Sequence, residues 1–123
     1  MTANGAPTGY HNLTIRLFVE DPAREVAFLR AAFGAQGELP DGRPAELTIG
    51  DSLLLVSGTD AREATRSFLY LYVPDVDAAY VRAIAAGATS LEEPRDVPYG
   101  DRRAMVEDPF GNSWQIATML TPR

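Results

Sequence analysis

The stretch MVEDPFGNSWQIAT, residues 105–118, carries the strongest structural signal in this sequence. A strand-like run meets Asp-Pro-Phe-Gly at residues 108–111, and a second strand-like run follows at residues 113–118. Proline and glycine stand where a type I turn favours them, so the stretch predicts two strands joined by a tight turn. Gln115 lies in the second strand. Whether the protein could hold a metal depends on this residue and on those aligned with it in the other strands.

Length and composition bound the class of protein. The chain has 123 residues, which is enough for one domain with a modest core. It has no cysteine, no lysine and a single histidine, His11, which excludes disulfides, Schiff-base chemistry and a multi-histidine metal site within one chain. No apolar run reaches the length of a membrane span, and the N-terminus lacks a signal-peptide pattern, so we expect a cytoplasmic protein.

Charge and residue usage say less about function. A formal net charge of -6 argues against binding to nucleic acid and is compatible with a cationic small molecule. The same charge is also what keeps an ordinary acidic protein soluble. Arginine as the sole long basic residue, together with frequent alanine, indicates a GC-rich bacterial genome.

The first half of the chain predicts a strand, a helix and a hairpin. Apolar residues alternate through residues 13–20, and Asp21-Pro22 provides a helix cap followed by proline at the first helical position. Helical spacing continues to Gly34, which ends the helix. Two short strands then lie within residues 45–58, joined by a two-residue turn at Gly50-Asp51.

The same order of elements restarts in the second half. The strand signal at residues 67–73 precedes a helix that Pro74-Asp75 opens and Gly87 closes. Further strands are expected at residues 89–93, 103–107 and 113–118.

Internal similarity supports a duplication. LTIRLFVED at residues 13–21 aligns with SFLYLYVPD at residues 67–75, and GDSLLLV at 50–56 aligns with GNSWQIA at 111–117. Two matching ends in the same order predict two copies of a strand–helix–strand–strand unit, with or without a further strand. The expected organisation is a flexible lead-in (1–12), one domain (13–118) made of two modules (13–58 and 66–118), and a tail (119–123).

The residues quoted above resemble the vicinal oxygen chelate superfamily, which includes glyoxalases, extradiol dioxygenases and bleomycin-resistance binding proteins. The resemblance runs from Leu13 to Thr118 and rests most heavily on YGDRRAMVEDPFGNSWQIAT at residues 99–118. It implies an α+β fold of two tandem βαβββ modules whose curved mixed sheet forms a cup. It also implies a homodimer with cups built or closed across the subunit interface.

The resemblance also locates the positions of metal ligands in related enzymes, on the first and last strands of each module. The corresponding residues here are Thr14, Leu54, Phe68 and Gln115. Leucine and phenylalanine cannot ligate a metal, and one hydroxyl and one amide do not hold a transition metal unaided. We therefore expect no metal and no cofactor. His11 would point to the opposite face of the sheet from Thr14 if the strand extended that far, and would otherwise be solvated.

Strand alternation separates an expected core from an expected binding face. The aliphatic sides, Leu13/Ile15/Leu17/Val19 and Leu69/Leu71/Val73, should pack on the helices together with Trp114. Aromatic rings and a few polar groups on the other side suit a planar organic ligand. The segment at residues 92–103 resembles the family's cup-rim loop, although Arg102 and Arg103 are as well explained as solvated charges. The candidate ligand-binding residues are Thr14, Arg16, Phe18, Leu54, Phe68, Tyr70, Tyr72, Tyr99, Asp101, Met105 and Gln115.

Two functions follow from this pattern. The first is a metal-free binding protein, similar in style to bleomycin-resistance proteins, that sequesters an aromatic or antibiotic-like natural product. The alternative is a glyoxalase-like lyase, isomerase or cyclase, using a tyrosine, Glu46 or Glu107 as acid or base, or a non-standard metal site. A dimer partner covering the rings of Phe68, Tyr70 and Tyr72 would explain them without a ligand. The identity of the ligand, its turnover, the role of His11 and whether the cup lies within one chain stay open at this stage.

Overall fold

The computed structural model describes residues 3–60 and 62–122. Met1, Thr2 and Arg123 lie outside the described residues, as does Ala61, so the expected lead-in and tail are only partly covered. The elements in chain order are β1 (Ile15–Phe18), α1 (Pro22–Phe33), β2 (Ala45–Ile49), β3 (Ser52–Ser57), β4 (Phe68–Tyr72), α2 (Val76–Ala85), β5 (Thr89–Asp96), β6 (Asp101–Glu107) and β7 (Ser113–Met119).

Both helices begin where the sequence predicts. Asp21 caps α1 by accepting a hydrogen bond from the Arg24 backbone N–H, and Gly34 ends the helix with a left-handed φ of 69°. Asp75 caps α2 in the same way through the Ala78 N–H. These side chains satisfy backbone donors that the first turn of a helix leaves unpaired.

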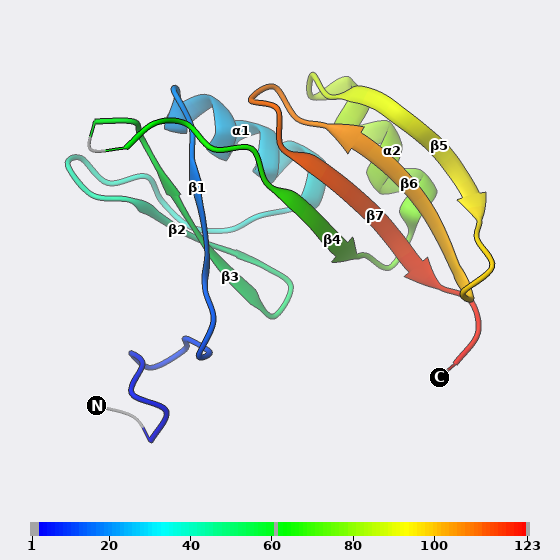
Figure 1. Cartoon of the computed structure of the whole chain (residues 1–123), viewed down its shortest axis with the longest axis horizontal. Coiled ribbons are helices and arrows are strands. Elements are labelled where there is room, and N and C mark those ends of the chain that lie inside the picture. The colour runs from blue at the N-terminus through cyan, green and yellow to red at the C-terminus, as the bar shows by residue number, and fades with distance from the viewer. Residues whose placement is uncertain (1–2, 61, 123) are drawn as a thin grey trace.

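The strands form two separate sheets, with the strand orders β1-β3-β2 and β4-β7-β6-β5 (Figure 1). In each sheet the first strand runs parallel to the last strand of its own unit, which confirms the tandem repeat. The first unit lacks the counterpart of β5: a single bridge between Gln36 and Thr48 takes its place. The two sheets share no strand pairing, so the expected single curved sheet is divided into two.

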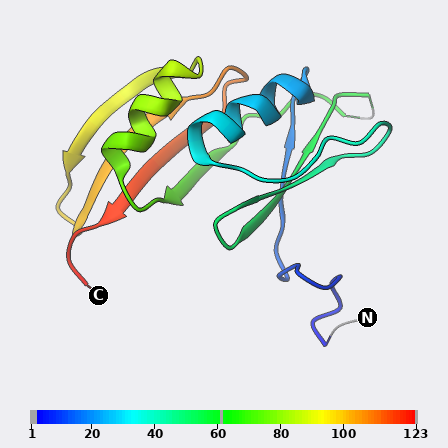
Figure 2. The same cartoon turned by 180° about the vertical axis from the view of Figure 1, so that it is seen from behind.

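Helices α1 and α2 lie side by side on one face of the sheets (Figure 2). The opposite face of both sheets, seen from the front in Figure 1, carries no helix, and we call it the open face. The hydrophobic core lies between the helices and the sheets, with Leu17, Leu47, Val56, Val106 and Ile116 fully buried. No helix in the described part of the chain is long and apolar enough to cross a membrane.

The predicted core is correct for most of its members and wrong for two. Leu17, Val19 and Trp114 are buried, and Leu69, Leu71 and Val73 pack against the core. Leu13 is 83% exposed and Ile15 is 43% exposed, contrary to the alternation argument. Leu13 precedes β1, and Ile15 lies at the start of the strand, where it borders a cavity between the sheets.

The internal alignment of the last strands also requires correction by one residue. Leu54 is buried in the core with Val56, so the prediction that it faces the open side is wrong. Residues 53–57 and 113–117 show the same alternation of half-buried and buried positions, which makes Leu54 equivalent to Trp114. Pairing agrees, since Arg16 lies opposite Leu55 as Tyr70 lies opposite Gln115. Leu55 therefore occupies the position that corresponds to Gln115.

The two units are joined where α1 meets the turn between β6 and β7. The rings of Phe33 and Trp114 lie 5.0 Å apart, and the Trp114 indole N–H donates to Asp108 Oδ2 at 3.0 Å. Asn112 Nδ2 donates to Asp108 Oδ2 at 3.0 Å and to Glu25 Oε2 at 3.2 Å. Because Glu25 belongs to α1 and the other polar groups belong to the turn, this cluster connects the first unit to the second.

Glu25 is fully buried, and its environment favours the protonated carboxyl. Burial, and next the hydrogen bond and negative charge of Asp108, raise the pKa of Glu25 from 4.5 to about 9, while the Asn112 amide acts in the opposite direction. Two buried acids and one amide can satisfy one another when one acid retains its proton. The cluster thus couples the joint between the units to a protonation event.

We predict that this proton makes the stability of the protein fall as pH rises. The folded-state pKa lies above the unfolded value, so the contribution is complete below about pH 4.5 and is lost progressively towards about pH 9. In urea unfolding followed by circular dichroism, Glu25→Gln should remove a slope of up to about 1.4 kcal/mol per pH unit in that window. A difference between wild type and Glu25→Gln that stays constant with pH would contradict the shared proton.

Candidate functional site

The open face of the second sheet carries three exposed aromatic rings on β4. Phe68, Tyr70 and Tyr72 are 67%, 43% and 53% exposed, although large aromatic side chains are usually buried to a greater extent. The rings of Tyr70 and Tyr72 lie 5.3 Å apart at an interplanar angle of 53°. Alternation along β4 places all three on the side away from α2, as the sequence predicts.

Asp101 fixes the two tyrosines. Its side chain is 2% exposed, and Oδ2 accepts hydrogen bonds from Tyr70 Oη at 2.7 Å and from Tyr72 Oη at 2.9 Å. Burial, the hydrogen bond to Asp101 and the charge of Asp101 together raise the pKa of Tyr70 to about 12. The phenol of Tyr70 therefore keeps its proton at neutral pH, and the rings are held as a fixed surface.

Three predicted residues form a row across this sheet. Tyr70 pairs with Gln115 on β7, and Gln115 pairs with Met105 on β6. The row brings an aromatic ring, an amide and a thioether side by side on the open face. An ion pair between Arg103 and Glu92, 3.5 Å apart, borders it on β6 and β5.

The equivalent row on the first sheet has a different chemistry. Arg16 pairs with Leu55 on β3, and Leu55 pairs with Glu46 on β2. The Arg16 guanidinium lies over the ring of Phe18, with 5.1 Å between the guanidinium carbon and the ring centroid. Its Nε donates to Ser57 Oγ at 2.9 Å. Arg16 is exposed, Phe18 is half-buried, and Thr14 lies half-buried just before the strand.

A cavity of about 270 Å³ lies between the two sheets and is lined by residues from both of them. Its walls are mainly apolar, and they include Leu54, Phe68 and Tyr70. Among the predicted residues, Leu54 therefore belongs to this cavity rather than to the open face. A second hollow of about 400 Å³ lies over the first sheet, beside Leu55 and Glu46, with Tyr10 on its border.

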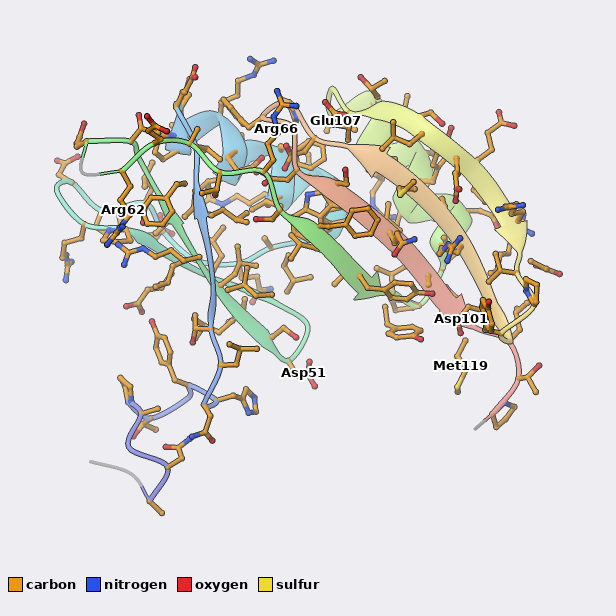
Figure 3. The ribbon with its side chains drawn as sticks, in the orientation of Figure 1. Asp51, Arg62, Arg66, Asp101, Glu107 and Met119 are labelled. Carbon is orange, nitrogen blue, oxygen red and sulfur yellow. The ribbon has the colours of Figure 1, made fainter. Side chains whose placement is uncertain are left out.

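The residues of the predicted rim loop, within residues 92–103, lie in different surroundings. Asp101 is drawn into the tyrosine cluster at the start of β6, next to Met119 (Figure 3). Tyr99 is 78% exposed in the turn before it. Arg102 turns to the helix side, where it binds Asp77 of α2 at 2.9 Å and Asp96 at 3.1 Å. Arg102 thus ties α2 to the sheet rather than standing as a free solvated charge.

The residues present do not fit the metal site of related enzymes. Two of the four positions are Thr14 and Phe68, and the other two are Gln115 and a leucine, whether Leu54 or Leu55 is taken. Such a set offers one amide and one hydroxyl, which is too few donors for a divalent first-row metal. Within residues 3–60 and 62–122, no three His, Cys, Asp or Glu side chains gather to hold a metal ion.

This fold and this face define a class of small α+β proteins built from a duplicated unit. A family model, the Glyoxalase/Bleomycin resistance protein/Dioxygenase superfamily, matches residues 11–116. The chain therefore belongs to that superfamily.

Solved structures and curated proteins are similar to this chain. TioX from Micromonospora sp. ML1 is 29% identical, with a TM-score of 0.76 over 88% of this chain and 98% of TioX. A family member from Burkholderia phytofirmans PsJN is 24% identical with a TM-score of 0.76, over 87% and 97% of the two chains. An uncharacterized protein of Mycobacterium bovis is 46% identical over 48 residues, which make up 39% of this chain and 32% of that protein.

Several site residues lie outside the sequence-based set. Leu55 was missed because of the one-residue slip between the repeats. Ser57 and Glu92 have no sequence signal of their own, since their roles come from contacts with Arg16 and Arg103 across strands. Cross-strand contacts depend on register, which the sequence alone does not determine here.

We predict that the tyrosine hydroxyls stabilise the fold through Asp101. Tyr70→Phe or Tyr72→Phe removes a hydrogen bond to a buried carboxylate and should lower the free energy of unfolding by about 1–3 kcal/mol. The control is Tyr80→Phe, which loses an exposed hydrogen bond to Ser90 and should cost less. Urea unfolding at neutral pH measures all three; equal losses would show that Asp101 gives no special stability.

Proposed function

We propose that this protein binds a planar aromatic small molecule of antibiotic-like character and sequesters it unchanged. The observation that carries the proposal is the ring surface of Phe68, Tyr70 and Tyr72 on a sheet face that no helix covers. A flat ligand laid on these rings removes apolar surface from water and gains about 0.5–1.5 kcal/mol for each stacked pair beyond that burial.

Polar groups beside the rings would let the protein distinguish a specific ligand from other hydrophobic compounds. Gln115 presents an amide between Tyr70 and Met105, and the Arg16 guanidinium stands on the other sheet. A few such groups in an apolar surface fix the orientation of a ligand. The thioether of Met105 adapts its shape to irregular rings. All the predicted site residues except Leu54 remain candidates for contacts on the open face.

The residues at the four positions that hold metal ligands in related enzymes support a function without a metal. Thr14, Phe68, Gln115 and a leucine cannot replace the ligand set that polarises a substrate in related enzymes. Acid–base chemistry finds little support on the rings, because Tyr70 holds its proton with a pKa of about 12. Glu25, whose pKa is raised to about 9, lies buried in the joint between the units.

The proposal includes a homodimer. Leu13, Ile15 and Leu120 are exposed apolar residues, and a cavity opens between the sheets beside Ile15. A second copy that covers these residues would remove them from water. Size-exclusion chromatography with light scattering should then give twice the mass of one chain at micromolar concentration, and a monomer mass would contradict this part.

We predict that fused-ring compounds bind and that the rings on β4 are responsible. Naphthamide, a neutral probe, should bind the wild-type protein in isothermal titration calorimetry. Phe68→Ala and Tyr72→Ala should each weaken binding roughly three- to tenfold, because each removes a stacking surface. The matched control is Val81→Ala on α2, which removes an exposed apolar side chain from the covered side of the sheet.

Recovery of the ligand separates sequestration from catalysis. After long incubation with a panel of aromatic natural products, mass spectrometry should return every bound compound unaltered. A product of different mass or a rearranged isomer would support the lyase or isomerase alternative instead. Equal affinity of wild type and both ring variants would show that the open face of the second sheet is not the site.

A further inference from the structure

We propose that Arg16 is an anion-recognition residue, and that the protein selects aromatic ligands that carry a carboxylate. This inference rests on the proposed binding of an aromatic ligand to the open face and names the class of ligand. It assigns the ring of the ligand to the second sheet and the acidic group to the first.

The guanidinium of Arg16 is held in place before any ligand arrives. Its Nε donates to Ser57 Oγ at 2.9 Å, and its carbon lies 5.1 Å from the centre of the Phe18 ring. Ser57 is buried and belongs to β3, so the contact anchors a long flexible side chain to the sheet. A side chain ordered in advance loses less entropy on binding than a free one, which strengthens recognition.

Arg16 makes no ion pair with an acid in the described part of the chain. The ion pairs of residues 3–60 and 62–122 join acids to Arg30, Arg95, Arg102 and Arg103. This occurs in a protein with 17 acidic and 11 basic residues, where carboxylates are plentiful. An ordered cation that the protein's own acids leave without an ion pair is available to an acid from outside.

The shape of the donor favours a carboxylate. A guanidinium has five N–H donors, and Ser57 engages the one on Nε. The two terminal nitrogens keep parallel donors that match the two oxygens of a carboxylate in an end-on pair. A single phenolate oxygen would engage this pair of donors less completely.

Neighbouring residues set the direction of the ligand. Leu55 lies beside Arg16 as an apolar floor, and Glu46 lies one strand further, about 10 Å from Arg16 at roughly 5 Å per strand. The negative charge of Glu46 disfavours an acid at that end of the row. The acidic group is therefore steered to β1, the strand that carries Arg16.

A matched trio of probes tests the inference. Naphthoate, naphthamide and naphthylmethylammonium share a ring system and differ in charge, so calorimetric titration compares charge at nearly constant shape. The wild-type protein should bind naphthoate about tenfold or more tightly than naphthamide, which corresponds to one charge-assisted hydrogen-bonded pair. The preference should shrink as salt is added, because the contact is partly exposed.

Variants assign the preference to one side chain. Arg16→Gln should lose the preference, so that the affinities for naphthoate and naphthamide become nearly equal. Arg16→Lys should keep part of the preference for naphthoate, since an ammonium retains the charge without the paired donors. The control is Arg24→Gln, which removes a different arginine whose guanidinium lies 5.7 Å from the ring of Phe110, and it should leave the preference intact.

Each result bears on a definite claim. If naphthamide binds but naphthoate gains nothing, or if Arg16→Gln keeps the preference, the inference about Arg16 is wrong and the proposed binding function survives. Tightest binding of naphthylmethylammonium would overturn the inference in favour of cation recognition. If no member of the trio binds at millimolar concentration, the proposed function and the inference both fail. Circular dichroism of each variant confirms that it is folded.

Discussion

The contact between α1 and the turn that precedes β7 is the constraint on which the rest of the structure depends. The two sheets share no strand pairing in the described part of the chain, so the packed helices and this turn help to fix their relative position. The Asn112 amide donates to both Glu25 and Asp108 there, although the other carboxyl oxygen of Glu25 has no hydrogen-bond partner among the described residues. Trp114 joins the cluster by donating to Asp108 while packing on Phe33. A buried polar network of this kind is stabilising only when its members are paired, so it specifies one relative position.

The open face follows from that position. With the helices packed on one side, the other side of both sheets carries no helix in the described part of the chain (Figure 1). Equivalent rows on the two sheets have diverged, Arg16–Leu55–Glu46 on the first and Tyr70–Gln115–Met105 on the second. Duplication thus supplied two similar surfaces, one now charged at its ends and the other aromatic. Asp101 adds rigidity by holding both tyrosine hydroxyls.

Local features of the fold were predictable from the sequence, and long-range ones were less so. Helix caps at Asp21 and Asp75, the hairpin turn at Gly50 and the core position of Trp114 each depend on a few adjacent residues or on strand alternation. The open-face position of Phe68, Tyr70 and Tyr72 followed from alternation alone. Leu54 was misplaced because a one-residue slip in an alignment reverses the face of a strand. The partners of Asp101, Arg16 and Glu25 come from other strands or units, so no local pattern reveals them. In the case of Glu25, helical spacing with Leu29 and Ala32 was a usable sign of burial that charge alone obscured.

The central claim is that the open face, and not the cavity between the sheets, binds a ligand through its ring on one sheet and its acidic group on the other. Chemical-shift mapping in ¹⁵N-labelled protein titrated with naphthoate tests it most directly. The account predicts the largest shifts at Arg16 and Phe18 on β1 and at Tyr72 on β4, none of which lines the cavity, with little change along α2. Shifts concentrated at Leu54, Leu71 and Trp114, around the cavity, or along the helices would contradict it.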